Sequence, residues 1–285
     1  MKIAISCETT ADLTKELIKE FDIKIIPFQI FLGDKSYLDG EITTDEIIDF
    51  VAKNKILPKT GAINSFQYEE HFNNILKNYD VIIHFSLSSE LSSAYQNAKN
   101  VAEKMENVFV IDTKTLSTGI ALLALYAKKL VEDGLDAKTI YEKCLERLPK
   151  VQASFELKRL DYLYKGGRCS ALMYYGANLL NIRPQIIVKD GKMISGKKYR
   201  GNFEHVVNNY CKDVLEEFNT PDLSVAFVTY TTASQEVIDI AINHLKSAGF
   251  EKVYVTRAGG TITSHCGENC LGILYINDGA TEISN

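Results

Sequence analysis

Short apolar runs rich in β-branched residues alternate with amphipathic helical patterns along this chain of 285 residues. In the first half these runs are Ile3 to Ser6, Ile23 to Phe31, Val81 to Phe85 and Val108 to Ile111. The helical patterns between them begin at residues that favour helix starts, namely Thr44, Ser65 and Ser88 to Ser92. Strands that alternate with helices are joined by right-handed crossovers and pair in parallel. We therefore predict an α/β fold whose N-terminal sheet is mostly parallel and flanked by helices.

A change of pattern near residue 150 divides the chain. Two helical patterns fill Leu116 to Leu148, separated by Gly134, and Pro149 ends the second. The elements predicted after this point are a strand Val151 to Phe155, a break at Gly166 and Gly167, a helix through Leu180, a hairpin of Arg183 to Lys189 and Lys192 to Tyr199 around Asp190-Gly191, a helix to Phe218, a strand Val225 to Thr229, a helix Ser234 to Ala248, a strand Val253 to Thr256, a glycine-rich loop holding His265, and a strand Ile273 to Ile276. We predict two α/β domains, residues 1–150 and 151–285, the second with a mixed sheet.

The distribution of charged and apolar residues argues against several classes of partner. The chain has 37 acidic and 32 basic residues, and the basic ones are dispersed, which does not favour nucleic acid. After Lys2 the apolar run ends at Ser6, far short of the roughly 7 to 15 residues of a signal-peptide core. The longest apolar stretch, Ile120 to Ala127, is too short for a membrane span of about 20 residues and predicts a buried helix. We expect a cytoplasmic protein with reduced cysteines and no integral membrane association.

Two motifs resemble ligand sites but lack residues that those sites need. Gly191 to Lys198 reads GKMISGKK, yet a P-loop needs Ser or Thr where Lys198 stands, and the flanking pattern predicts a hairpin. His265, Cys266 and Cys270 lie close together, but the chain offers no C-x-x-C spacing and no second ligand pair there. We therefore predict neither a nucleotide site nor a metal site.

The stretch Ser86 to Ala98 carries five serines between an apolar strand and a helix. One or two of them would suffice to cap the helix. Additional hydroxyls and exposed N–H groups at a helix start, where the macrodipole is positive, favour a carboxylate or a phosphate. No G-x-S-x-G elbow is present, although Ser92, His265 and Asp112 could in principle form a hydrolytic triad. An anion site and a hydrolase therefore both stay open at this point.

Segments in order along nearly the whole chain resemble those of the DegV family, which includes the fatty-acid-binding subunits of bacterial fatty acid kinase. They are CETTADL from Cys7, Pro27 followed by Tyr37 to Gly40, KTGAINS from Lys59, SSELSSAYQNA from Ser88, Ile111 to Thr113, GGR ending at Arg168, and GGTITSHCG from Gly259. The resemblance implies two α/β domains, with an acyl chain buried between layers and its carboxylate at the domain cleft.

The resemblance also assigns residues. Thr60 and Ser92 match the hydroxyl side chains that bind the carboxylate in this family, and His265 matches a histidine near the head group. Arg168 and Arg200 match basic positions near the mouth of the cleft.

Some neighbours of these residues depart from the family pattern. Gly61 and Ser93, which we also place in the ligand site, stand where the family has serine and glycine. Ala94 replaces a threonine, and Glu268-Asn269 replaces Pro-Gly.

The predicted function is the binding of a long-chain fatty acid such as palmitate by a protein that is not itself an enzyme and needs no cofactor. The resemblance further implies that the protein presents the head group to a separate fatty acid kinase, or that it serves lipid transport. Two alternatives stay open. One is a serine-dependent acyl-ester hydrolase, and the other is a binder of small polar ligands such as sugars or trioses.

Overall fold

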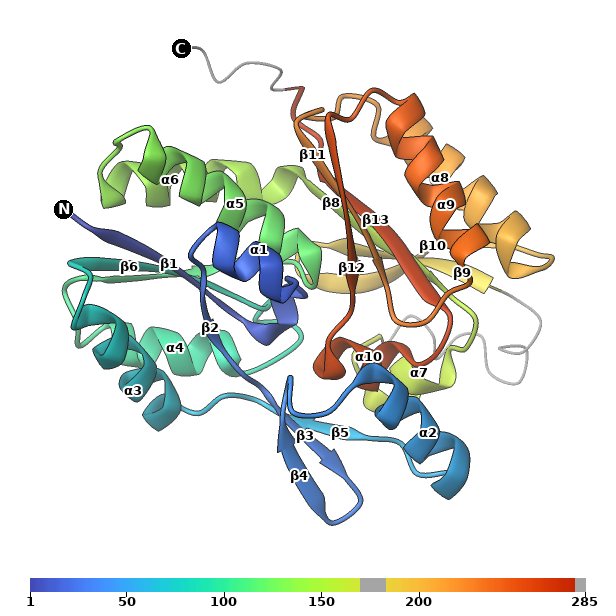
Figure 1. Cartoon of the computed structure of the whole chain (residues 1–285), viewed down its shortest axis with the longest axis horizontal. Helices are drawn as coiled ribbons and strands as arrows, with labels where there is room; N and C mark the ends of the chain where they lie inside the picture. Colours follow the sequence, from blue (N-terminus) through green and yellow to red (C-terminus); the bar gives the residue numbers. More distant parts are fainter. Residues whose placement is uncertain (170–182, 280–285) are drawn as a thin grey trace.

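The computed structural model describes residues 1–169 and 183–279 and shows an α/β protein built around two large sheets (Figure 1). The first sheet has four strands, all parallel, in the order β2-β1-β6-β7. They are β1 (Ile3–Glu8), β2 (Lys24–Ile26), β6 (Val81–Ser86) and β7 (Val108–Asp112). β1 and β6 are buried along their whole length, as central strands of a parallel sheet are when helices cover both faces. The prediction of a parallel N-terminal sheet is confirmed.

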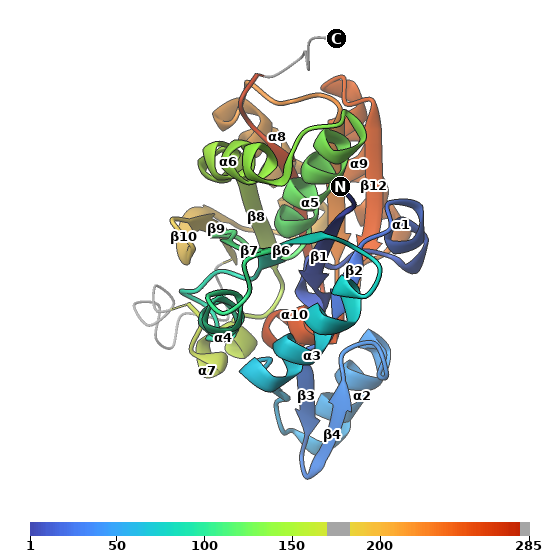
Figure 2. The same ribbon diagram turned by 90° about the vertical axis from the view of Figure 1, so that its left-hand side faces the viewer.

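The run Ile23 to Phe31 does not form the single strand that we predicted. β2 ends before Pro27, which has no N–H to continue a ladder, and β3 (Gln29–Leu32) belongs to another sheet. There β3 pairs antiparallel with β4 (Lys35–Leu38) and β5 (Lys59–Gly61). This small sheet projects from one end of the molecule together with helix α2 (Figure 2). The sequence pattern did not predict β5, the strand that contains Thr60.

The structure describes six helices in the first half, and the patterns predicted all of them except the first. They are α1 (Lys15–Glu20), α2 (Thr44–Asn54), α3 (Ser65–Leu76), α4 (Ala94–Ala102), α5 (Thr118–Glu132) and α6 (Ala137–Arg147), with a 3-10 turn η1 (Thr9–Ala11) after β1. The caps of α2 and α3 are Thr43 and Asn64, one residue before the predicted starts, and each forms a capping box with the residue three positions later. The apolar stretch predicted as a buried helix is the first part of α5, buried from Thr118 to Leu125.

The second large sheet is mixed, as predicted. Its order is β10-β9-β8-β13-β11-β12, and only β11 and β12 pair in parallel. Its strands are β8 (Val151–Leu157), β9 (Arg183–Lys189), β10 (Lys192–Tyr199), β11 (Val225–Tyr230), β12 (Lys252–Arg257) and β13 (Cys270–Ile276), and its outer helices are α8 (Phe203–Glu217) and α9 (Gln235–Ser247). The hairpin predicted at Asp190-Gly191 joins β9 to β10.

Two short helices near the site differ from expectation. α7 (Asp161–Gly166) ends at the glycine pair and was not predicted, and the helix predicted after the pair, through Leu180, falls largely outside the described residues. The glycine-rich segment after β12 was predicted as a loop but forms α10 (Gly260–Cys266), so His265 lies on a helix. A helix was not expected because Gly259 and Gly260 disfavour one locally.

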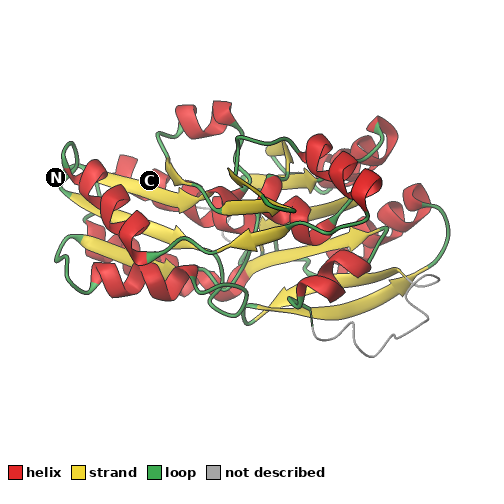
Figure 3. Ribbon diagram, turned by 90° about the horizontal axis from the view of Figure 1, so that it is seen from below, coloured by secondary structure: helices red, strands yellow, loops and turns green. Residues whose placement is uncertain are grey.

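α5 lies between the two large sheets and contacts strands of both. Helices α3 and α4 pack against the first sheet, and α8 and α9 pack against the second. Figure 3 shows the sheets with helices packed on them. Buried side chains from both halves, such as Ile5 and Phe155, belong to one apolar core. The domain boundary predicted at residue 150 falls at the turn η2 (Leu148–Lys150) and stays a prediction. Within residues 1–169 and 183–279, no helix has the length and apolarity that crossing a membrane requires.

Candidate functional site

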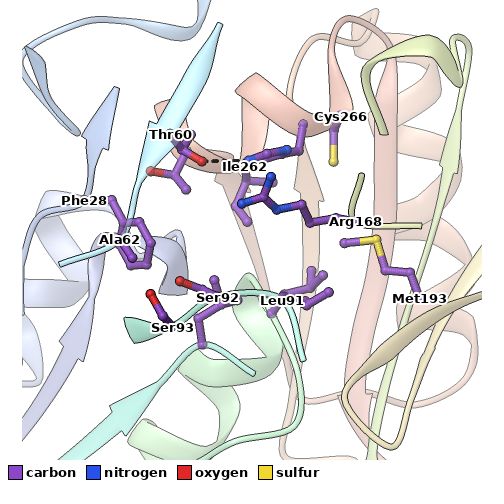
Figure 4. Close-up of a pocket in the computed structure, with 14 residues that line it drawn as sticks. Phe28, Thr60, Ala62, Leu91, Ser92, Ser93, Arg168, Met193, Ile262 and Cys266 are labelled. Atoms are coloured by element: carbon purple, nitrogen blue, oxygen red, sulfur yellow. Dashed lines mark hydrogen bonds between the residues drawn. The ribbon is translucent and has the colours of Figure 1, made fainter. Parts of the chain in front are cut away.

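A cavity of about 250 Å³ lies where β5, the loop after β6, β10 and α10 meet (Figure 4). Most of the side chains that line it are apolar, and the polar ones come from segments far apart in the sequence. The lining residues are Phe28, Thr60, Ala62, Leu87, Leu91, Ser92, Ser93, Leu116, Arg168, Met193, Thr261, Ile262, His265 and Cys266. An apolar cavity with a few convergent polar groups is the usual form of a small-molecule site.

The serine loop, residues 86–93, turns tightly between β6 and α4. The N–H groups of Leu91 and Ser92 both donate to the carbonyl of Ser88. The hydroxyl oxygen of Ser92 accepts a hydrogen bond of 3.2 Å from the N–H of Ala94, the first residue of α4. The hydroxyl hydrogen of Ser92 is therefore available to an acceptor in the cavity.

The fully buried carboxylate of Glu8 holds the start of the serine loop. It accepts hydrogen bonds from the N–H of Leu87 at 2.6 Å, from the hydroxyls of Ser86 and Tyr68 at 2.5 and 2.6 Å, and from Thr10 at 3.1 Å. Burial opposes ionisation, but His84 and the hydroxyl donors outweigh it and lower the pKa of Glu8. An ionised acid at the end of β1 therefore fixes where the chain leaves β6.

Thr60 and His265 form the opposite wall of the cavity. Thr60 Oγ1 lies 2.8 Å from His265 Nε2, a hydrogen bond drawn in Figure 4. Burial and the nearby Arg168 cation lower the pKa of His265 to about 4, so the ring is neutral at pH 7. Nδ1 of this ring has no hydrogen-bond partner among the described residues. Because a buried unpaired N–H is costlier than an unpaired acceptor, we assign the proton to Nε2, which then donates to Thr60 and leaves the Thr60 hydroxyl hydrogen free.

The G-G-R sequence at the end of α7 has a structural reason at each position. A Cβ atom on Gly166 would lie 2.8 Å from His265 Nδ1, so only glycine lets the ring take this place. Gly167 ends α7 in the left-handed region, with φ at 70°. Arg168 then lines the cavity from an exposed position and donates to the carbonyl of Gly166 at 2.6 Å.

Two buried acids of the first half hold the start of α10. Asp12 accepts from the N–H of Gly259 at 2.7 Å, and Asp39 accepts from those of Gly260 and Thr261 at 2.8 and 3.0 Å. Burial raises the pKa of Asp12 to about 8, against the lowering effect of its hydrogen bonds. Our sequence reasoning missed both acids as site residues, although each lies in a segment that carries the family resemblance. They position the helix that bears His265.

The structure brings together most of the residues predicted for the site. Thr60, Ser92, Ser93, His265 and Arg168 all line the one cavity. Gly61 follows Thr60 on β5 but does not line it, and Arg200 is exposed just after β10, also outside the lining. The contribution of each residue to ligand binding stays a prediction.

The described residues do not assemble the hydrolytic triad considered from the sequence. His265 Nε2 bonds Thr60 rather than Ser92. Asp112 accepts from the N–H groups of Ser89 and Lys114 and pairs with the Lys114 ammonium at 2.8 Å. Ser92 therefore has no histidine base in hydrogen-bond contact. Nor do residues 1–169 and 183–279 place three or more His, Cys, Asp or Glu side chains where they could hold a metal ion.

A family model described as "Uncharacterised protein, DegV family" matches residues 2–278. Among related sequences, a DegV domain-containing protein of Clostridium acetobutylicum is 30% identical over 281 residues, covering 96% of this chain and 98% of that protein. A Thermotoga maritima protein named "Fatty acid-binding protein" is 28% identical over 281 residues, covering 95% of this chain and 96% of the relative.

Solved structures of similar proteins share the fold over almost the full length. One is described as "Fatty Acid Binding of a DegV family Protein from Thermus thermophilus", with a TM-score of 0.89, 23% identity, and coverage of 98% of this chain and 100% of that one. Another is a stearic acid-binding protein from Eubacterium ventriosum, with a TM-score of 0.85, 25% identity, and coverage of 98% and 100%. The N-terminal parallel sheet and the C-terminal mixed sheet are thus parts of an architecture already known from experiment.

Proposed function

Because the chain belongs to the DegV family, we propose that it binds a long-chain fatty acid, with the tail in the apolar cavity and the carboxylate at Thr60 and Ser92. The observation that carries this proposal is the meeting of two hydroxyls from separate segments at one apolar cavity. The oxygen of each is engaged by the protein, by Ala94 N–H at Ser92 and by His265 at Thr60, so each has a hydrogen to donate. Two such donors match a carboxylate, which only accepts hydrogen bonds.

The two parts of such a ligand would contribute differently. A palmitate-like tail has about fourteen methylenes, which at ~0.8 kcal/mol each amount to a gross gain on the order of 11 kcal/mol before ordering costs. A carboxylate moved into a partly dry site costs several kcal/mol unless donors meet it. Tail burial therefore supplies the affinity in this proposal, and the hydroxyls set the orientation and the preference for an acid head group.

The place of the head group suggests how the protein works. Exposed Arg168 lines the cavity beside His265, so we place the mouth of the site there. A protein of this kind would present the carboxylate to a separate kinase, or carry the lipid between partners, with the chemistry residing in the partner. All six cysteines are buried thiols outside any disulfide of the described residues, which supports a cytoplasmic location. Neither a cofactor nor nucleic acid enters this proposal.

The head-group and tail assignments predict a displacement order. A fluorescent fatty acid bound to the delipidated protein should be displaced by palmitate at the lowest concentration. Methyl palmitate should need at least about tenfold more, because the ester lacks the charge that strengthens hydrogen bonds from the hydroxyls. Dihydroxyacetone should not displace the probe. Equal displacement by acid and ester would contradict carboxylate recognition, and efficient displacement by dihydroxyacetone would favour a small polar ligand instead.

A further inference from the structure

The hairpin that resembles a P-loop in sequence contacts the serine loop at its tip. Gly191, at the turn between β9 and β10, accepts a hydrogen bond of 2.9 Å from the buried hydroxyl of Ser88. Gly191 is itself buried and has a φ of +82°, a conformation that favours glycine. Two residues further along, Met193 of β10 lines the cavity. The hairpin therefore contacts the serine loop through Gly191 and lines the cavity through Met193.

Side chains of the first half enclose the tip on three sides. A Cβ atom on Gly191 would lie 2.5 Å from Ser88 Oγ, 3.0 Å from Lys114 Cδ and 3.2 Å from Glu90 Cγ. The neighbouring Lys192 ammonium lies 3.4 Å from a Glu90 carboxylate oxygen. A Cβ atom at position 191 therefore fits only if the side chains of the serine loop, Ser88 first, move aside.

Ser88 also connects the tip to the proposed carboxylate donor. Its carbonyl accepts from the N–H of Ser92 at 3.2 Å, and its own N–H donates to the carbonyl of Thr115 at 3.1 Å. Its hydroxyl oxygen accepts from the N–H of Glu90 at 3.2 Å while donating to Gly191. A displacement of Ser88 would therefore move Ser92 directly, because one hydrogen bond joins them.

We propose that Gly191 is a positioning residue for the fatty-acid carboxylate, acting through Ser88 on Ser92. This rests on the proposed function. The GKMISGKK segment then has a structural role. Its turn, in the second half of the chain, holds the serine loop of the first half in the geometry that binds an anion. By linkage, a carboxylate bound at Ser92 stabilises the docked hairpin to the same extent that docking stabilises binding.

A pair of glycine substitutions tests this inference. Gly134, between α5 and α6, has the same φ of +82° as Gly191, but a Cβ atom there would meet nothing within 4 Å. Gly191→Ala and Gly134→Ala therefore place an alanine at the same positive φ, and only the first meets side chains of the serine loop. We expect Gly191→Ala to weaken palmitate binding about tenfold, and Gly134→Ala to leave it within about twofold of wild type.

Two further measurements separate positioning from general destabilisation. Gly191→Ala should weaken palmitate binding much more than methyl palmitate binding. In a Ser92→Ala background, Gly191→Ala should lower the affinity for palmitate by less than about twofold, because the donor that it displaces is already gone. Ser88→Ala removes the bond to Gly191 without backbone strain, so it should show the same acid-specific loss even if Gly191→Ala fails to fold. Wild-type affinity in both Gly191→Ala and Ser88→Ala, or equal losses for acid and ester, would overturn the inference. Failure of the proposed function would look different, because the wild type itself would not bind palmitate.

Discussion

Replacing Ser92 with alanine should weaken the binding of a long-chain fatty acid by roughly 10- to 150-fold, because one charge-assisted hydrogen bond is worth about 1.5 to 3 kcal/mol. The protein should stay folded, since the Ser92 hydroxyl is half-buried and, among the described residues, accepts a single hydrogen bond, from Ala94 N–H. Displacement of a fluorescent fatty acid measures the change. Ser65→Ala is a matched control, because that hydroxyl lies outside the cavity lining, and it should bind like the wild type.

Thr60→Ala should act on the same carboxylate. Its loss should be similar in size, and the double variant should lose less than the sum of the two single losses. A nucleophilic Ser92 would behave differently: Ser92→Ala would abolish turnover of an acyl ester and leave affinity for the acid intact, and the wild type would form a covalent serine adduct. Unchanged affinity together with lost turnover would replace the binding proposal with the hydrolase.

Replacing Glu8 with glutamine should lower the free energy of unfolding by about 2 to 5 kcal/mol at pH 7, without any direct contact with the ligand. Glu8 accepts from four buried donors, whereas a glutamine offers one carbonyl oxygen and turns an amide toward the others. Urea unfolding at pH 7 measures the difference. An exposed acid, Glu216→Gln, provides the control and should change stability by less than about 0.5 kcal/mol.

The pH dependence of that difference follows from the lowered pKa of Glu8. A carboxyl whose pKa is lowered on folding contributes stability above its unfolded value of about 4.3 and loses it as the pH falls through the folded value. The gap between wild type and Glu8→Gln should therefore narrow in acid. Burial lowers the pKa values of His71 and His265, so both also reduce the stability of the fold as the pH falls from about 6.5 toward those values. The wild type and Glu8→Gln share this loss, so it does not change the difference in stability between them. A gap that widened in acid would show that Glu8 is protonated in the native protein.

The sequence predicted those elements whose pattern is local. β1 and β6 are short apolar runs rich in β-branched residues, α5 begins with a longer apolar stretch, and the Asp190-Gly191 turn is a hairpin signal in itself. The small sheet of β3, β4 and β5 was missed because its strands have only three or four residues, and β3 is separated from β2 by Pro27. Such strands exist through pairing with partners elsewhere in the chain.

The distinction between local patterns and contacts with distant segments also applies to the site. Hydroxyls at the start of a helix indicated an anion site, and the family resemblance singled out Thr60, Ser92 and His265. α10 could not be predicted, because the acidic side chains that accept from its first N–H groups, Asp12 and Asp39, lie more than 200 residues earlier in the chain. The support of Ser92 by Glu8 and Gly191 likewise depends on contacts between distant segments. A sequence pattern can suggest which residues bind a ligand, but the residues that position them become visible only in the fold.

The most direct test of fatty-acid binding is the content of the protein as it is purified. We expect mass spectrometry of an organic extract to show long-chain fatty acids at close to one per chain, because a buried tail dissociates slowly and is retained through purification. Extracts of Ser92→Ala, purified in parallel, should contain less fatty acid than the wild type, and extracts of the variant with both Thr60→Ala and Ser92→Ala should contain still less. A wild-type extract without lipid, from protein that also fails to take up added palmitate, would contradict the account.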